Sequence, residues 1–186
     1  MQSNHKIEAT TLHVAFISCD YPPYVFGGIG VFSKEFAEAL SSNDVETTVL
    51  AAHELNTASV ETIHHNLRII RIPTFSFPPR DLWWQTRNFN LIIRLLLKIS
   101  PDIIHLNSGM CSLPLRAIEK RLKRPIVVTV HGDLKEIMKI ALKYARVMQP
   151  YDFLMYVAAA PLHEMLLRAD QESADCMVAS AKHVKK

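Results

Sequence analysis

The sequence has few cysteines, no metal-binding spacing and no block of one charge, and each shortage excludes a class of protein. Its three cysteines are far apart and form no Cys-x-x-Cys pair, so a disulfide scaffold and a cysteine zinc site are excluded. Nine histidines occur without His-x-x-x-His or His-Glu-x-x-His spacing, so no metal site is predicted. Unpaired thiols favour a reducing, cytoplasmic compartment.

The charge and hydropathy patterns exclude two further classes. A net charge of +3, spread along the chain, lacks the clustered basic face of a nucleic-acid-binding protein. Residues 1–10 are polar, without the apolar core of a signal peptide, and we expect them to be disordered or tag-like. The most hydrophobic stretch, residues 91–99, contains Arg94 and Lys98 and is too short to span a bilayer. A cytoplasmic protein remains, with or without peripheral contact to a membrane.

Glycine is scarce, yet three of the five glycines lie in one turn. Gly27, Gly28 and Gly30 follow an apolar run that reads as a strand and precede an amphipathic segment that reads as a helix. Unpaired amides and the positive helix end can bind an anion there, and glycine lets a phosphate approach the backbone. The spacing is neither Gly-x-Gly-x-x-Gly nor a nucleoside-triphosphate loop, and glycines that merely permit a tight turn are the alternative.

Strand and helix signals alternate along the chain. Short strands without polar alternation are buried on both faces, and helices between them are natural crossovers. The sequence therefore predicts an α/β fold with a doubly wound, Rossmann-like parallel sheet, in a single domain over residues 11–186. The predicted strands are 12–19, 45–52, 67–72, 103–106, 125–130 and 175–180, and the predicted helices are 29–41, 82–100, 112–122, 134–148 and 153–169.

Three polar segments follow predicted strands. They are residues 20–30, Asn107-Ser108-Gly109 and His131-Gly132-Asp133. In a doubly wound sheet, ligands bind beyond the carboxyl ends of the strands. We therefore expect these segments to meet at one site.

With these residues placed, the chain resembles the amino-terminal domain of family 4 glycosyltransferases, which have the two-domain GT-B architecture. The resemblance covers about residues 11–186 and rests on motifs in matching order. They are Asp20-Tyr21-Pro22-Pro23, then Gly27-Gly28-Ile29-Gly30, Ser100-Pro101-Asp102-Ile103-Ile104-His105, residues 125–132 ending in His131-Gly132, and residues 174–180.

The resemblance implies retaining transfer of a sugar from a nucleotide-sugar donor to an acceptor, with no cofactor and usually no metal ion. It implies that Gly28 approaches the donor diphosphate through a backbone amide, while Gly27 and Gly30 shape the loop. His131 matches the family histidine that lies over the transferred sugar. A structural histidine at a strand end is the alternative for that residue.

Candidate residues for the acceptor side include Tyr21, Asn107 and Asp133, which lie in the polar segments. Arg80 and Trp84 belong to an aromatic and basic stretch that can stack on a sugar or lie at a lipid interface. Under the alternative, Leu82 and Trp83 pack under the loop while Trp84 half-covers the surface. A carbohydrate or lipid-linked acceptor is expected.

Donor recognition in the family rests mainly on a carboxy-terminal domain, whose basic pair and two glutamates have no match here. The chain is therefore expected to be an acceptor-side half that is inactive alone. Two alternatives remain open, namely a non-catalytic GT-B half-fold that acts as a binding or structural partner, and a nucleotide-sugar epimerase.

Overall fold

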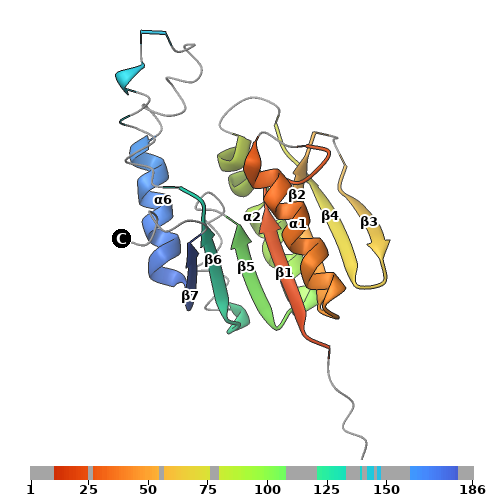
Figure 1. The fold of residues 1–186 in the computed structure, drawn as a ribbon. Coiled ribbons are helices and arrows are strands. Elements are labelled where there is room, and N and C mark those ends of the chain that lie inside the picture. The colour runs from red at the N-terminus through yellow and green to blue at the C-terminus, as the bar shows by residue number, and fades with distance from the viewer. Residues whose placement is uncertain are drawn as a thin grey trace, which may run out of the picture.

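The computed structural model describes residues 11–24, 27–54, 57–75, 80–107, 121–132, 139, 142–144, 146–147 and 160–179. Within these ranges seven strands form one sheet in the order β3-β4-β2-β1-β5-β6-β7 (Figure 1). In chain order the elements are β1 His13–Ser18, α1 Gly28–Ser42, β2 Glu46–His53, β3 Ser59–His64, β4 Leu67–Pro73, α2 Arg80–Ile99, β5 Ile103–Asn107, β6 Ile126–Val130, α6 Ala160–Ser173 and β7 Cys176–Ala179.

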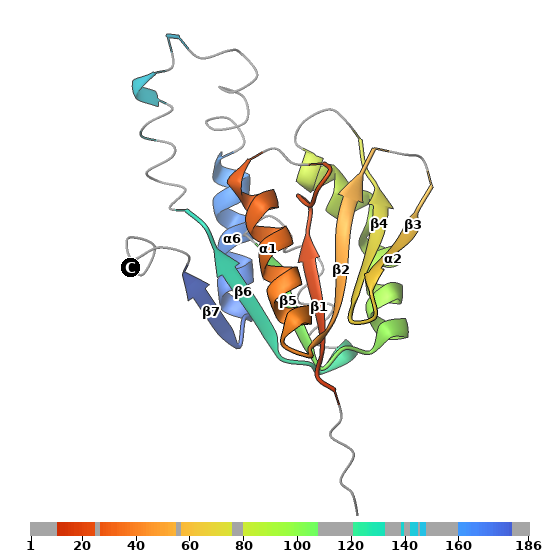
Figure 2. The ribbon, with the colours of Figure 1, turned by 45° about the vertical axis from the view of Figure 1, so that its right-hand side comes forward.

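The predicted α/β fold with a doubly wound, mostly parallel sheet is confirmed. All strand pairs are parallel except β3 with β4. Helix α1 covers one face of the sheet, and α2 and α6 cover the other (Figures 1 and 2). Most of the predicted helices 112–122 and 134–148 lies outside the described residues.

The two faces of the sheet follow from the alternation of side chains along each strand. In β1, Phe16 packs toward α1 with Phe32 and Phe36, whereas Ala15 and Ile17 face the larger core with α2. Both sets are buried, which is why β1 carries apolar residues at consecutive positions. The apolar run that predicted this strand is thus continuous because helices cover both faces of the sheet at β1.

Strand β3 corrects the sequence prediction, which placed no strand between residues 52 and 67. It pairs antiparallel with β4 at the edge of the sheet and exposes four of its six residues. An edge strand needs only one neighbour and no buried face, so its sequence carries no hydrophobic pattern. The exposed side chains include Val60 and Ile63.

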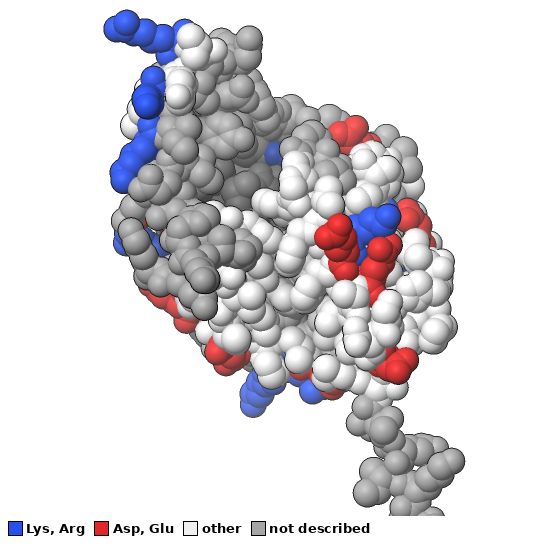
Figure 3. All heavy atoms as spheres, viewed as in Figure 1, with Lys and Arg blue, Asp and Glu red and all other residues white. Residues whose placement is uncertain are grey.

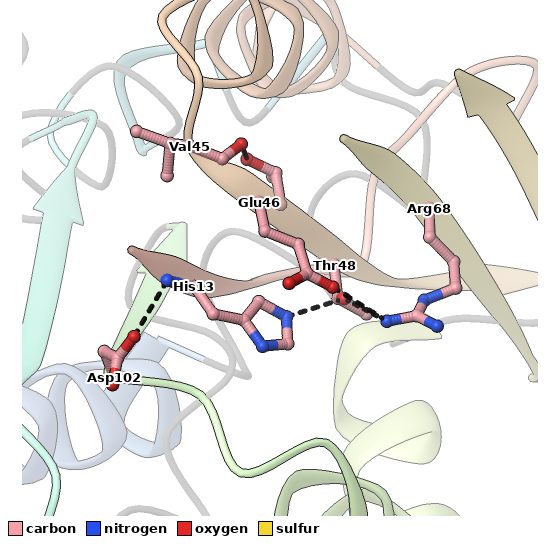
Figure 4. Close-up of polar contacts among 7 residues, drawn as sticks. His13, Val45, Glu46, Thr48, Arg68 and Asp102 are labelled. Atoms are coloured by element: carbon pink, nitrogen blue, oxygen red, sulfur yellow. Dashed lines mark hydrogen bonds and ion pairs between the residues drawn. The ribbon is translucent and has the colours of Figure 1, made fainter. Parts of the chain in front are cut away.

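The amino ends of the strands are joined by polar contacts (Figure 4). Asp102 precedes β5, and its Oδ2 accepts the amide of His13 at 2.9 Å, while its own amide donates to the His13 carbonyl at 2.8 Å. Asp175 precedes β7 and makes the same pair of contacts with Ile126, at 2.8 and 2.9 Å. These aspartates, found in two of the family-like motifs, therefore have a structural role.

Candidate functional site

The candidate site lies at the carboxyl edge of the sheet between β1 and β5. From β1 the chain first adds β2, β4 and β3 on one side of the sheet. It then returns to the other side of β1 and adds β5, β6 and β7, so the direction of strand addition reverses between β1 and β5. Ligands of doubly wound sheets bind at such a reversal. Ser18 ends β1, Asn107 ends β5, and His131 follows β6.

A buried hydrogen-bond network joins these strand ends to α1. Asn107 Nδ2 lies 3.1 Å from Ser18 Oγ and 2.6 Å from Ser33 Oγ, and donates to both. On its other side, Asn107 Oδ1 lies 2.6 Å from His131 Nε2. Residues that are far apart in the sequence thus meet around one amide.

The two serine hydroxyls continue the network to the main chain. Ser18 Oγ donates to the Asp20 carbonyl at 2.8 Å, and Ser33 Oγ donates to the Ile29 carbonyl at 2.7 Å. Both serine side chains are completely buried. The network therefore contacts the turn after β1 and the first turn of α1.

His131 is half-buried and lies edge-on to the Phe32 ring, with the ring centroids 4.6 Å apart. Burial lowers the pKa of His131 below its usual 6.5. The nearby His105 donates to or accepts from Thr129 Oγ1 at 2.7 Å, and its pKa is lowered to about 4 by burial and secondarily by His131. Both imidazoles are therefore neutral at pH 7.

The start of α1 has open backbone amides. Gly27 is the N-cap residue, no side chain caps the helix, and the first turn holds no acidic residue. Gly27 and Gly28 are exposed, and a Cβ added at either would meet no atom within 4 Å. Gly27 has an extended backbone and Gly28 a helical one, and neither lies in the left-handed region, so backbone conformation does not require glycine there. Open space before helix amides is what an anion needs.

Gly30 differs from the other two glycines. It is buried, and its amide donates to the Gly27 carbonyl at 3.3 Å. It therefore tightens the first turn, and its amide is already engaged. Gly28 is the best placed of the three to meet a ligand.

The turn that leads to the glycines is held by Arg71 of β4. This arginine, 3% exposed, donates from Nη1 to the Tyr21 carbonyl at 3.3 Å and from Nη2 to the Pro22 carbonyl. Its Nε lies 2.9 Å from Glu61 Oε1 on β3, and its guanidinium lies over the Tyr21 and Tyr24 rings. Figure 3 shows charged side chains of both signs gathered over α1, the helix that carries the exposed Lys34–Glu38 ion pair.

Replacing Glu61 by alanine is expected to lower the free energy of unfolding by about 1–3 kcal/mol, because the buried Arg71 loses the one carboxylate that pairs with it in the described part of the chain. The matched control is Glu46→Ala, which breaks a contact with the half-exposed Arg68 at 3.4 Å and should cost less than about 1 kcal/mol. Urea denaturation of both variants measures the difference. Equal losses would contradict a role for Glu61 beyond that of a surface charge.

Several predicted acceptor residues are buried, which corrects their assignment. Trp84 is 0% exposed and lies in the core, so the expectation that it half-covers the surface is wrong. Tyr21 is 3% exposed, and burial, helped by the Glu38 charge, raises its pKa to about 12. Neither side chain offers an open face for stacking on a sugar.

The remaining acceptor candidates are also placed differently from the prediction. Asn107 is 2% exposed, and its amide atoms are all engaged in the network. Arg80 is buried at the start of α2 and lies 3.8 Å from Glu54. Asp133 lies outside the described residues. The described candidates are thus buried residues, and the role of Asp133 stays a prediction.

Sequence reasoning missed Ser18 and Ser33. Ser18 was read as part of an apolar strand, and Ser33 lies on the buried side of α1 beside Phe32 and Phe36. A small hydroxyl residue on an apolar face, next to a glycine turn, is the signal that could have identified them. Their common partner, Asn107, comes from a strand 74 residues further along the chain than Ser33.

Two further features concern only the described part of the chain. No group of three His, Cys, Asp or Glu side chains there is arranged to hold a metal ion. None of the helices in the same ranges combines the length and apolarity that a membrane crossing requires.

The family model of Glycosyltransferase Family 4 matches residues 26–185. Among solved structures, sucrose-phosphate synthase from Thermosynechococcus elongatus is similar, with a TM-score of 0.70 and 17% identity over 94% of this chain and 43% of that one. Arabidopsis thaliana UGT89C1 complexed with UDP gives a TM-score of 0.57 and 12% identity, over 92% and 43%. Phytolacca americana UGT2 gives 0.56 and 10%, over 91% and 45%. No curated protein matches the sequence significantly.

Proposed function

Because this chain belongs to glycosyltransferase family 4, we propose that it supplies the acceptor-side half of an active site that moves a sugar from a nucleotide-sugar donor to an acceptor, with retention of configuration. The observation that carries the proposal is the open start of α1 beside the neutral His131, at the reversal of the strand order. An anion site and a neutral hydrogen-bonding group lie together there.

The donor diphosphate is proposed to meet the amides of the first turn of α1. As the bond between sugar and diphosphate breaks, the leaving oxygens gain negative charge. Helix amides that are already oriented stabilise that charge without rearrangement, and the helix dipole adds to the effect. Gly28 leaves the space in front of these amides empty.

His131 is proposed to hydrogen-bond the transferred sugar. A neutral imidazole has one donor nitrogen and one acceptor nitrogen. Its Nε2 is already engaged with Asn107, so Nδ1 can accept a hydrogen bond from a sugar hydroxyl. Such a hydrogen bond orients the sugar above the diphosphate, and it can strengthen as positive charge develops on the sugar ring.

The chain spans less than half the length of the structurally similar chains named above. We propose that the remaining half of the cleft comes from a carboxy-terminal domain, which would recognise most of the donor, so that residues 1–186 alone are inactive. The UDP complex of UGT89C1 supports a nucleoside diphosphate as the donor's leaving group. A carbohydrate or lipid-linked acceptor and a metal-independent reaction complete the proposal.

Thermal unfolding of the protein expressed from its complete reading frame tests the proposal. A donor present at about 100 times its dissociation constant should add about 2.7 kcal/mol to the free energy of unfolding, because it binds only the folded state. UDP-, GDP- and ADP-linked hexoses are tried in turn, and at least one should raise the Tm. The free sugars serve as controls and should leave it unchanged. No shift with any of the nucleotide sugars would contradict the proposal.

A further inference from the structure

We propose that Asn107 is a positioning residue that fixes His131 in the tautomer protonated at Nε2 and, through Ser33, holds the first turn of α1 in place. The proposal rests on the function proposed above, in which the imidazole binds the sugar and the amides of α1 bind the phosphate, because Asn107 would then orient both groups. The hydrogen bonds of Asn107 themselves can be tested whether or not that function is correct.

The direction of each hydrogen bond follows from which atoms carry protons. Ser18 Oγ and Ser33 Oγ lie within 2.8 Å of backbone carbonyls, which can only accept, and they lie 2.8 Å from each other. The two hydroxyls have one proton each for these three contacts, so the serine oxygens need further donors rather than a further acceptor. Asn107 Nδ2 has two protons and reaches both oxygens, at 3.1 and 2.6 Å. The amide is therefore oriented with its nitrogen toward the serines.

This orientation determines the state of His131. Asn107 Oδ1 faces Nε2 at 2.6 Å and can only accept, so Nε2 carries the proton. In the neutral ring Nδ1 is then unprotonated. No second hydrogen bond to His131 occurs among the residues that the structure describes. Nδ1 is thus left as an acceptor for a hydroxyl group.

The same amide holds the start of α1 against the sheet. Ser33 lies one helical turn after Ile29 and donates to its carbonyl, while accepting from Asn107 on β5. The contact between β5 and α1 therefore passes through the turn whose amides are open. Removal of the Asn107 amide would take away the two protons that it donates to the serine oxygens, at a place that is completely buried.

The burial of this network argues against a merely structural role. Asn107 is 2% exposed and directly follows Leu106, which belongs to the apolar core. Apolar side chains of similar volume often replace buried polar groups with no loss of stability. A buried network whose hydrogen bonds are all made, by contrast, holds each of its side chains in one orientation. We therefore expect its loss to change orientation as well as stability.

NMR of the ring nitrogens tests the tautomer in the 186-residue chain without any ligand. Two-bond proton–nitrogen correlations should show His131 protonated at Nε2 in the original protein and a mixture of both tautomers in Asn107→Leu. Asn107→Asp keeps an acceptor, so the Nε2–H tautomer should persist while the pKa of His131 rises beside the carboxylate. Asn88→Ala is the matched control, since it removes a buried asparagine of α2 whose amide donates to two carbonyls.

The outcomes separate cleanly. Protonation at Nδ1 in the original protein, or an unmixed Nε2–H tautomer in Asn107→Leu, would overturn the proposal. If Asn107→Leu does not fold, Asn107→Asp decides: an unchanged pKa for His131 would overturn the proposal, and a raised pKa would support it. Asn88→Ala should alter neither the tautomer nor the pKa.

Titration with inorganic pyrophosphate tests the second half of the proposal. The amide signals of Gly27 and Gly28 should shift in the original protein, and the apparent Kd should weaken at least about 5-fold in Ser33→Ala but not in Asn88→Ala. Equal Kd values in the original protein and Ser33→Ala would overturn the role at the helix start. If pyrophosphate shifts no glycine amide at all, the proposed donor site fails, and the tautomer result still decides the role of Asn107 toward His131.

Discussion

Replacing His131 by alanine is expected to lower glycosyl transfer about 10²- to 10³-fold while lowering the free energy of unfolding by only about 1–2 kcal/mol. The activity falls because the sugar loses the acceptor at Nδ1 that would orient it. The loss of stability is smaller because the ring is half-buried, and among the described residues its removal leaves only Asn107 Oδ1 without its donor. Initial rates and urea denaturation of the complete protein measure the two quantities.

The matched control is His65→Ala, an exposed histidine in the turn between β3 and β4, which should change neither quantity. Similar fractional losses of transfer and of stability in His131→Ala would instead indicate a structural histidine. The pH profile gives a further check. Because burial lowers the pKa of His131 below 6.5, the ring stays neutral and transfer should stay level from about pH 8 to about pH 6.5. The loss on acidification should begin only below that range.

Replacing Gly28 by alanine is expected to lower transfer about 10- to 100-fold and to leave the fold intact. The new methyl group would occupy the space that a phosphate oxygen needs in front of the amides, although the amides themselves remain. The protein itself has room for this group, since no atom lies within 4 Å of the added Cβ and φ is not positive. Stability should rise by up to about 1 kcal/mol, because alanine restricts the unfolded chain.

Ser42→Ala, at the other end of the same helix, is the control for Gly28→Ala and should retain full transfer. Steady-state rates at varied donor concentration, together with thermal unfolding, distinguish the two variants. A Gly28→Ala protein with unchanged donor KM and kcat would show that the glycine serves only the turn. Loss of folding in this variant would contradict the empty space seen at the site.

The predictable parts of the fold are the buried parallel strands, because the run of apolar residues in each strand is enough to identify it. The parallel strands are continuous apolar runs because helices cover both of their faces, so composition alone located them. Strand β3 was missed because its edge position removes that constraint. Trp84 could have been assigned to the core, since Trp84, Ile92 and Leu96 recur at multiples of four on one side of α2 and all are buried.

The candidate site was predictable in position but not in its contacts. The three polar strand ends indicated where it lies, because parallel strands end at a common edge. The hydrogen bonds of Asn107 were not predictable, since they join β5 to Ser18 and Ser33 across separate elements. A polar residue after a strand is equally compatible with a ligand contact and an internal contact, and only burial distinguishes the two.

The carboxylates of Asp102 and Asp175 have an effect at the opposite edge of the sheet. Each fixes the start of one strand against the next, so it sets which residues lie level with each other along the whole pair. If β5 slid by one residue against β1, Asn107 would move about 3.3 Å and its side chain would turn to the other face. Precision at the candidate site is therefore maintained in part by two acidic groups at the far edge of the sheet.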